Sequence, residues 1–271
     1  MSNTASASSS RIDVDGGQLH VEQAGAGPDL LMVHSGITDS GMWDGQFNDF
    51  ATSFHVTRYD MRGYGSSSAI DAAYSHVDDL KHLIEVLQLD QPRVMAASMG
   101  ARVVLDLALR ENRAFNRLLL VGPAVSGYGF DDPALRACWD EMGAAWDAGD
   151  MDKAVDIETR FWINGPTRTA EEASEGVLEH VRRMQRRIVE LQPDDDPEVN
   201  EPEPAAERLD QLMMPILVVV GQHDVSDIHR NARALHQQAA DARVVYLPGT
   251  GHLPNLELVE EFNRIALDFL K

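Results

Sequence analysis

The chain has 271 residues, of which 44% are hydrophobic, and it carries a formal net charge of −21. This length and apolar content are sufficient for one large core with an inserted subdomain. Acidic residues outnumber basic ones 44 to 23, so a nucleic-acid partner, which requires patches of lysine and arginine, is not expected.

The N-terminal segment from Met1 to Ser10 is polar and serine-rich, without the apolar stretch of a signal peptide. No run in the sequence approaches the roughly 18 apolar residues that a membrane-spanning helix needs. The single cysteine, Cys138, can form no internal disulfide. We therefore expect a cytoplasmic protein with a frayed N-terminus and no membrane partner. The acidic excess is compatible with a salt-adapted source, in which salt screens the self-repulsion.

Strand-like and helix-like patterns alternate along the chain. Strands are expected near residues 18–24, 29–34, 54–60, 93–97, 117–122, 214–220 and 242–247. Helices are expected near residues 40–52, 75–88, 99–111, 229–239 and 256–270. The alternation predicts an α/β fold, with a mainly parallel sheet that is covered by helices on both faces.

About ninety residues between Val121 and Pro215 show helical rather than strand periodicity. The acidic, proline-containing segment from Pro193 to Pro204 is typical of a linker that returns the chain to the core. One apolar stripe of a helix is formed by Val177, Val181, Met184, Ile188 and Leu191. These patterns predict a helical insertion between two strands of the sheet.

Four arginines of the same helix form a second pattern: Arg182, Arg183, Arg186 and Arg187. They could attract an acidic substrate or form the solvent-exposed face of the helix. Glu179 lies four residues before Arg183, and Glu190 lies four residues after Arg186, which are spacings for surface ion pairs. The solvent-exposed face is therefore the favoured interpretation.

A short apolar run meets a small-residue turn in the segment VMAASMGA, at positions 94–101. A serine on a sharp turn from a strand to a helix points its hydroxyl out of the fold, where a substrate can reach it. The turn needs small residues two positions before and two positions after this serine, and Ala96 and Gly100 meet the need. Ser98 is thus a candidate nucleophile, with a helix N-cap as the alternative role.

A nucleophilic serine needs a base and a third group that orients the base. His252 lies in a glycine-flanked loop after the expected strand 242–247, and Asp224 follows the strand near 214–220. Asp227 competes with Asp224 for the third role, but Asp224 is favoured because it comes directly after the strand and its glycine turn. The sequence thus provides serine, aspartate and histidine in that order.

A metal site is the alternative use of the side chains near Asp224. Its candidate ligands are His223, Asp224, Asp227 and His229. Their spacing lacks the patterns typical of zinc sites. We therefore expect neither a metal nor another cofactor.

Two further segments carry a family resemblance. The strand near 29–34 runs into the small-residue loop His34-Ser35-Gly36, and residues 60–67 contain the pattern D-x-R-G-x-G-x-S. With the order serine, aspartate, histidine, the chain resembles the α/β-hydrolase superfamily from about Arg11 to Lys271. Within it, the chain looks most like the branch of 3-oxoadipate enol-lactonases and small carboxylesterases.

This resemblance implies an eight-stranded, mainly parallel sheet with helices on both faces and an inserted helical cap. The expected division is a first core segment at residues 1–124, a cap at 125–205 and a second core segment at 206–271. The resemblance also implies an oxyanion hole made of backbone N–H groups, from Met99 and from Gly36. Because the family usually has His-Gly-x where this chain has His34-Ser35-Gly36, Ser35 remains an alternative donor. Ser35 and Trp162 are candidate residues of the substrate pocket.

The implied activity is a cofactor-independent serine hydrolase acting on a small carboxylic ester or lactone through an acyl-enzyme. The alternatives with the same triad are a carbon–carbon bond hydrolase, a perhydrolase and a lyase, because the fold does not decide among them. A non-catalytic ligand receptor is an alternative of another class. The expected partner is a small-molecule substrate, and a homodimer is an open alternative to a monomer.

Overall fold

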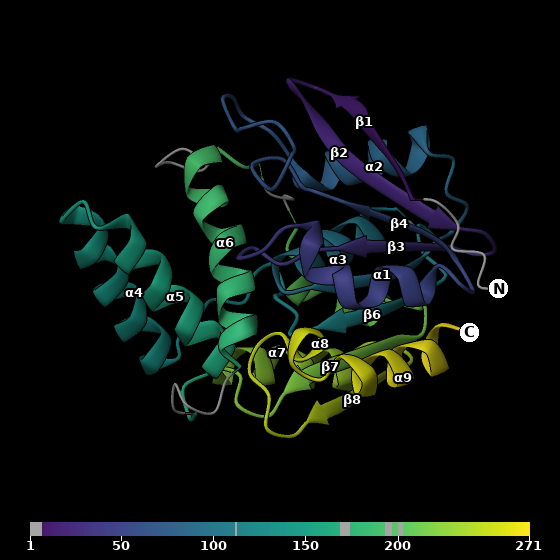
Figure 1. The fold of residues 1–271 in the computed structure, drawn as a ribbon. Helices are drawn as coiled ribbons and strands as arrows, with labels where there is room; N and C mark the ends of the chain where they lie inside the picture. Colours follow the sequence, from purple (N-terminus) through teal and green to yellow (C-terminus); the bar gives the residue numbers. More distant parts are fainter. Residues whose placement is uncertain (1–6, 112, 169–173, 193–196, 200–202) are drawn as a thin grey trace.

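The computed structural model describes residues 7–111, 113–168, 174–192, 197–199 and 203–271. Within these residues, eight strands form one sheet in the order β1-β2-β4-β3-β5-β6-β7-β8 (Figure 1). They are β1 (Ser8–Val14), β2 (Gly17–Gly25), β3 (Asp29–Val33), β4 (His55–Tyr59), β5 (Arg93–Ala97), β6 (Arg117–Val121), β7 (Ile216–Gly221) and β8 (Ala242–Leu247). β2 pairs antiparallel with β1 and β4, and the other neighbours pair in parallel. The predicted mainly parallel, eight-stranded sheet is confirmed.

Helices cover both faces of the sheet. α1 contacts α9 on one face, and α2 contacts α3 on the other (Figure 1). The helices are α1 (Asp44–Phe50), α2 (His76–Val86), α3 (Met99–Arg110), α4 (Pro133–Asp147), α5 (Met151–Asn164), α6 (Glu175–Leu191), α7 (Ser226–Gln238), α8 (Pro254–Glu257) and α9 (Val259–Leu270), with the short 3-10 helices η1 (Ser40–Trp43), η2 (Ala205–Glu207) and η3 (Leu209–Gln211). None of the helices in the described ranges is both long and apolar enough to cross a membrane.

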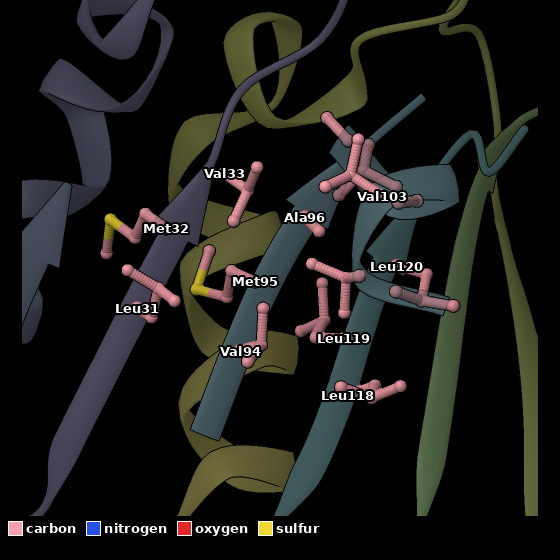
Figure 2. Close-up of a cluster of buried hydrophobic side chains, with 14 of the residues drawn as sticks. Leu31, Met32, Val33, Val94, Met95, Ala96, Val103, Leu118, Leu119 and Leu120 are labelled. Atoms are coloured by element: carbon pink, nitrogen blue, oxygen red, sulfur yellow. The ribbon is translucent and has the colours of Figure 1, made fainter. Parts of the chain in front are cut away.

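The centre of the sheet is made of β3, β5 and β6, whose apolar side chains are buried on both faces. A parallel strand between two helical layers has no solvent face, so its sequence is a continuous apolar run instead of an alternating one. Figure 2 shows these side chains side by side, from Leu31 and Val94 to Leu118. This packed centre provides a rigid support for the loops at the carboxyl ends of the strands.

The N-terminal edge of the sheet differs from the sequence prediction. Residues 8–10 were expected to be frayed, but they belong to β1 and pair with residues 21–23 of β2. Apart from the buried Ile12, the side chains of β1 are exposed or half-buried. An edge strand held by its backbone hydrogen bonds needs no apolar run, which is why the apolar pattern missed it.

Three helices, α4, α5 and α6, are inserted between β6 and β7 and stand beside the sheet, away from both chain termini (Figure 1). α4 packs against α5, and α5 packs against α6. The expected apolar stripe of α6 faces inward, except that Leu178 takes the buried position expected for Val177. Part of the predicted linker, residues 193–196 and 200–202, lies outside the described residues.

The prediction that the four arginines of α6 face solvent is wrong for one of them. Arg182 is only 8% exposed, and its guanidinium binds Asp156 of α5 and Glu179 of α6. Glu179 therefore pairs with the residue three positions later, where the sequence suggested Arg183 at four. Both spacings bring side chains together on a helix, and the contact with α5 decides between them. Likewise, Glu190 pairs with Arg187.

Candidate active site

Ser98 occupies the turn between β5 and α3. Its backbone has φ 49° and ψ −114°, a left-handed conformation that is costly for a residue other than glycine. The Ser98 N–H donates to the carbonyl of Val121 on β6, at 2.8 Å. The Ser98 side chain makes no capping hydrogen bond to α3, so the N-cap alternative has no support in the geometry.

Small residues allow this sharp turn. A Cβ on Gly100 would lie 2.3 Å from the carbonyl oxygen of His34 and 2.9 Å from a methyl group of Val33. Ala96 is fully buried in β5, between the neighbouring strands β3 and β6. The requirement for small residues thus arises because α3 starts directly against the end of β3.

Asp224 and His252 meet at the carboxyl ends of β7 and β8. Asp224 Oδ2 and His252 Nδ1 are 2.8 Å apart, and both side chains are buried. Because a carboxylate can only accept, Nδ1–H is the donor and Nε2 is left as an acceptor. The other oxygen of Asp224 accepts the N–H of Val225 at 2.8 Å. This pair holds the histidine in one tautomer, with a basic nitrogen on its far side.

Asp227 has a different set of partners. One of its oxygens accepts the N–H groups of Asp131 and Asp132, just before α4, and the other pairs with Arg230. Asp227 thus anchors the beginning of the helical insertion to α7. The structure brings Asp224 to His252 and directs the carboxylate of Asp227 elsewhere.

The loop of His252 packs directly against the insertion. The His252 N–H donates to the carbonyl of Trp162 near the end of α5, at 3.1 Å. A Cβ on Gly251 would lie 2.0 Å from the carbonyl oxygen of Ile163, and a Cβ on Gly122 would lie 2.9 Å from the His252 ring. Glycine is therefore required at both positions for α5 and β6 to approach the histidine.

A buried ion pair strengthens this contact and was missed by the sequence analysis. Arg168, after α5, pairs with Glu257 of α8 at 2.8 Å, with both side chains buried. Arg168 also donates to the carbonyls of Asn164 and Gly249, and the second oxygen of Glu257 accepts the N–H of Gly251. Because neither residue belongs to a sequence motif, only the tertiary structure reveals the pair.

Ser98 and His252 line the same cavity, which has a volume of about 280 Å³ and which we call the serine cavity. The ring of Trp162 lies against that of His252, with 4.5 Å between the ring centroids. The other lining residues include Gly36, Met99, Phe130, Trp139 and Glu158. The candidate nucleophile, base, oxyanion-hole residues and Trp162 thus face one space.

Ser35 does not line the serine cavity. Its hydroxyl lies 2.8 Å from the hydroxyl of Thr38, inside the loop, and its N–H donates to the same hydroxyl at 3.2 Å. His34 supports this loop: Nε2 accepts the N–H of Met61 at 2.9 Å, and burial lowers the pKa of the ring. With the N–H of Ser35 already engaged, Gly36 remains the better candidate for the oxyanion hole.

The two histidines of the alternative metal site have separate partners. His223 Nδ1 is hydrogen-bonded to Thr167, and the His229 ring stacks on Tyr246. Across the described ranges, no group of three or more histidine, cysteine, aspartate or glutamate side chains could hold a metal ion.

Glu158 is the acidic side chain of the serine cavity. It lies on α5 and accepts a hydrogen bond from the amide of Gln185 on α6. Burial raises the pKa of Glu158 to about 7, and the hydrogen bond from Trp162 opposes this shift only in part. Glu158 carries no sequence signal for this position, because an acidic residue on an amphipathic helix is normally solvent-exposed.

The raised pKa of Glu158 predicts a pH-dependent stability. Since the folded protein favours the protonated form, folding is penalised when Glu158 ionises. In chemical denaturation, the free energy of unfolding of the wild type relative to Glu158→Gln should fall as the pH rises from about 4.5 to about 7. It should then level off. A difference that is constant across this range would contradict the burial of an ionisable group at this position.

Comparisons with known proteins agree with this architecture. A profile of the alpha/beta hydrolase family matches residues 30–265. A pimeloyl-[acyl-carrier protein] methyl ester esterase of Nitrosomonas europaea is 25% identical, over 90% of this chain and 96% of that protein. A 2-hydroxy-6-oxo-6-phenylhexa-2,4-dienoate hydrolase of Comamonas testosteroni is 21% identical, over 93% and 91%. The crystal structure of the enol-lactonase of Burkholderia xenovorans has a TM-score of 0.77 and 24% identity, over 96% and 99%.

Proposed function

The chain belongs to the alpha/beta hydrolase family, and we propose that it is a serine hydrolase that cleaves a small carboxylic ester or lactone. The observation that carries the proposal is the buried 2.8 Å contact between His252 and Asp224 on a cavity that Ser98 also lines. The strained backbone of Ser98 supports it, because such strain concentrates at functional sites. We also propose that residues 125–205 act as the cap of this site.

In the proposed reaction, the Ser98 hydroxyl attacks the carbonyl carbon while His252 Nε2 takes the hydroxyl proton. Asp224 stabilises the resulting imidazolium. The tetrahedral intermediate collapses when the bond to the leaving oxygen breaks, and His252 returns the proton to that oxygen. A water molecule then attacks the acyl-enzyme by the same route, which releases the acid and regenerates Ser98.

The negative charge on the tetrahedral intermediate needs donors that are in place before the reaction. The Met99 N–H is one candidate, because the first N–H groups of a helix have no partner within the helix. The Gly36 N–H is the second, since Gly36 lines the same cavity and the neighbouring Ser35 N–H is engaged. Both donors belong to the backbone, so their positions are fixed by the fold.

A carbon–carbon bond hydrolase is the second candidate function. It would use the same three side chains to cleave a carbon–carbon bond beside a carbonyl group. The similarity to the dienoate hydrolase of Comamonas testosteroni favours it. A panel of substrates distinguishes the two candidate functions. It contains p-nitrophenyl acetate and butyrate, γ-butyrolactone, 3-oxoadipate enol-lactone and a vinylogous 1,5-diketone acid. Turnover of esters or lactones supports the first proposal, and turnover of the diketone alone supports the second. A failure of all of them favours a ligand receptor.

Chelation should leave the activity unchanged. The proposed nucleophile is a side chain, and the proposed oxyanion donors are backbone N–H groups, so the reaction uses no metal ion. Turnover after prolonged EDTA treatment and desalting should differ from the untreated value by no more than about a tenth of that value. Activity that disappears on chelation and returns with zinc would contradict the serine mechanism.

The turn at Ser98 should tolerate a smaller residue at position 96 but not a larger one. Ala96→Gly should keep turnover within a few fold, at a cost of roughly 0.5–1 kcal/mol in stability. Ala96→Val should displace Ser98 together with the Met99 N–H and lower kcat, because small displacements of both groups raise the barrier. Full activity in a folded Ala96→Val protein would exclude a compact turn at this serine.

A further inference from the structure

A second cavity adjoins the serine cavity. It has a volume of about 310 Å³, and we call it the distal cavity. The two cavities share Gly36 and Glu158 as lining residues. The cavities therefore meet at Gly36 and Glu158, which is where a molecule bound at Ser98 would enter the distal cavity.

The wall of the distal cavity is mainly apolar and is provided by all three helices of the insertion. α4 contributes Met142 and Trp146, α5 contributes Val155, and α6 contributes Ile188 and Val189. The Trp146 side chain is 40% exposed, which is unusual for so large an apolar group. An apolar chain bound here would cover this surface and gain the free energy of leaving water.

Glu158 stands where the two cavities meet. Its carboxyl group accepts hydrogen bonds from Gln185 and Trp162, which leaves acceptor capacity on its two oxygens. Across the described residues, no lysine or arginine side chain pairs with it. These free acceptor sites favour an N–H or O–H donor, and the ionised form of Glu158 disfavours a second carboxylate.

The arginine of the serine cavity does not reverse the preference of Glu158 for a hydrogen-bond donor over a carboxylate. Arg102 of α3 lines the cavity, but its guanidinium donates to both oxygens of Glu198, at 2.8 and 2.7 Å. Glu198 thus neutralises Arg102. The neutralised Arg102 therefore does not offset the unfavourable effect of Glu158 on an anionic substrate.

We propose that the substrate is a neutral ester or lactone with an apolar chain for the distal cavity and an N–H or O–H donor for Glu158, placed between the chain and the carbonyl. This inference rests on the proposed function, since it assumes that the carbonyl binds at Ser98. A 2-acylamino or hydroxylated ester or lactone has this arrangement of groups. Glu158 is then a specificity-determining residue.

Binding to the Ser98→Ala variant tests the substrate class without depending on turnover. The probe is N-octanoylglycine methyl ester, and the matched probe is methyl 4-oxoundecanoate, in which a CH₂ group replaces the N–H. Tryptophan fluorescence reports binding, because Trp146 and Trp162 line the cavities. The N–H probe should bind about tenfold more tightly than its isostere, as expected for a hydrogen bond to a charged or polar buried group.

Variants of Glu158 assign this preference to its side chain. Glu158→Leu should abolish the difference between the two probes, whereas Glu158→Gln should keep part of it, because its carbonyl oxygen still accepts. Equal affinity of both probes for the Ser98→Ala protein would overturn the role of Glu158. A preference that survives in a folded Glu158→Leu, Ser98→Ala protein would also overturn it.

A filling substitution tests the distal cavity. Val189→Trp should weaken binding of N-octanoylglycine methyl ester about tenfold or more and leave N-acetylglycine methyl ester within about twofold. The matched control is Val86→Trp, on an exposed position of α2, which should change neither affinity. An equal effect on both esters would overturn the chain site. If the predicted binding pattern holds but the wild type hydrolyses neither these two esters nor any ester or lactone of the panel, the proposed function fails and the binding site stands.

Discussion

Replacing Ser98 with alanine is expected to lower turnover by on the order of 10⁴-fold or more while the fold stays intact. The hydroxyl is the proposed nucleophile, and Ser98 carries the only hydroxyl or thiol among the described residues that line the serine cavity. Alanine keeps a Cβ, so the backbone requirement at φ 49° is the same in the variant. The measurement is kcat on a purified protein with unchanged circular dichroism and thermal midpoint.

Ser75→Ala is the matched control for this experiment. Ser75 caps α2 by accepting the N–H of Asp78, so its loss should cost about 1 kcal/mol of stability without changing kcat. The two serines thus separate a capping role from a catalytic role. If the Ser98→Ala protein keeps more than about a tenth of the wild-type kcat, Ser98 is not the nucleophile.

The second large effect is expected at the aspartate that contacts His252. Asp224→Asn should lower kcat by on the order of 10³–10⁴-fold, because an amide N–H facing Nδ1 would favour the wrong tautomer of the histidine. Asp227→Asn should change kcat far less, since Asp227 binds the N–H groups of Asp131 and Asp132 and the side chain of Arg230. Its loss should appear mainly as a lower thermal midpoint.

Both variants are compared on one substrate at one pH. The opposite ranking, with Asp227→Asn nearly inactive and Asp224→Asn active, would assign the orienting role to Asp227. A small effect of both substitutions would mean that His252 needs no carboxylate partner. Neither result is expected.

The sequence predicts the sheet well, together with the places of Ser98, Asp224 and His252 at the ends of its strands. Continuous apolar runs such as residues 118–121 are typical of strands that are buried on both faces, and the structure has β6 there. Ser98 and Asp224 follow such runs, in β5 and β7, and His252 lies in the loop after the edge strand β8. Their position at the carboxyl ends of parallel strands therefore follows from local patterns, before any contact between them is known.

The contacts made by the insertion could not be predicted in the same way. Arg168 and Glu257 are 89 positions apart in the sequence, and their pairing depends on how α5 meets α8. Glu158 has the pattern of a solvent-exposed residue, but Gln185 and Trp162 surround it in the structure. Arg182 was misassigned for the same reason. Such pairings are decided by tertiary packing, which overrides the local helical pattern.

Covalent labelling shows whether Ser98 is a nucleophile that His252 activates. The wild-type protein is incubated with a fluorophosphonate, which reacts with activated serines, and the intact protein and its peptides are weighed by mass spectrometry. This role of Ser98 predicts one adduct, located on Ser98, with concurrent loss of activity and no labelling of the Ser98→Ala protein. An adduct on another residue, or unchanged labelling of the Ser98→Ala protein, would contradict it.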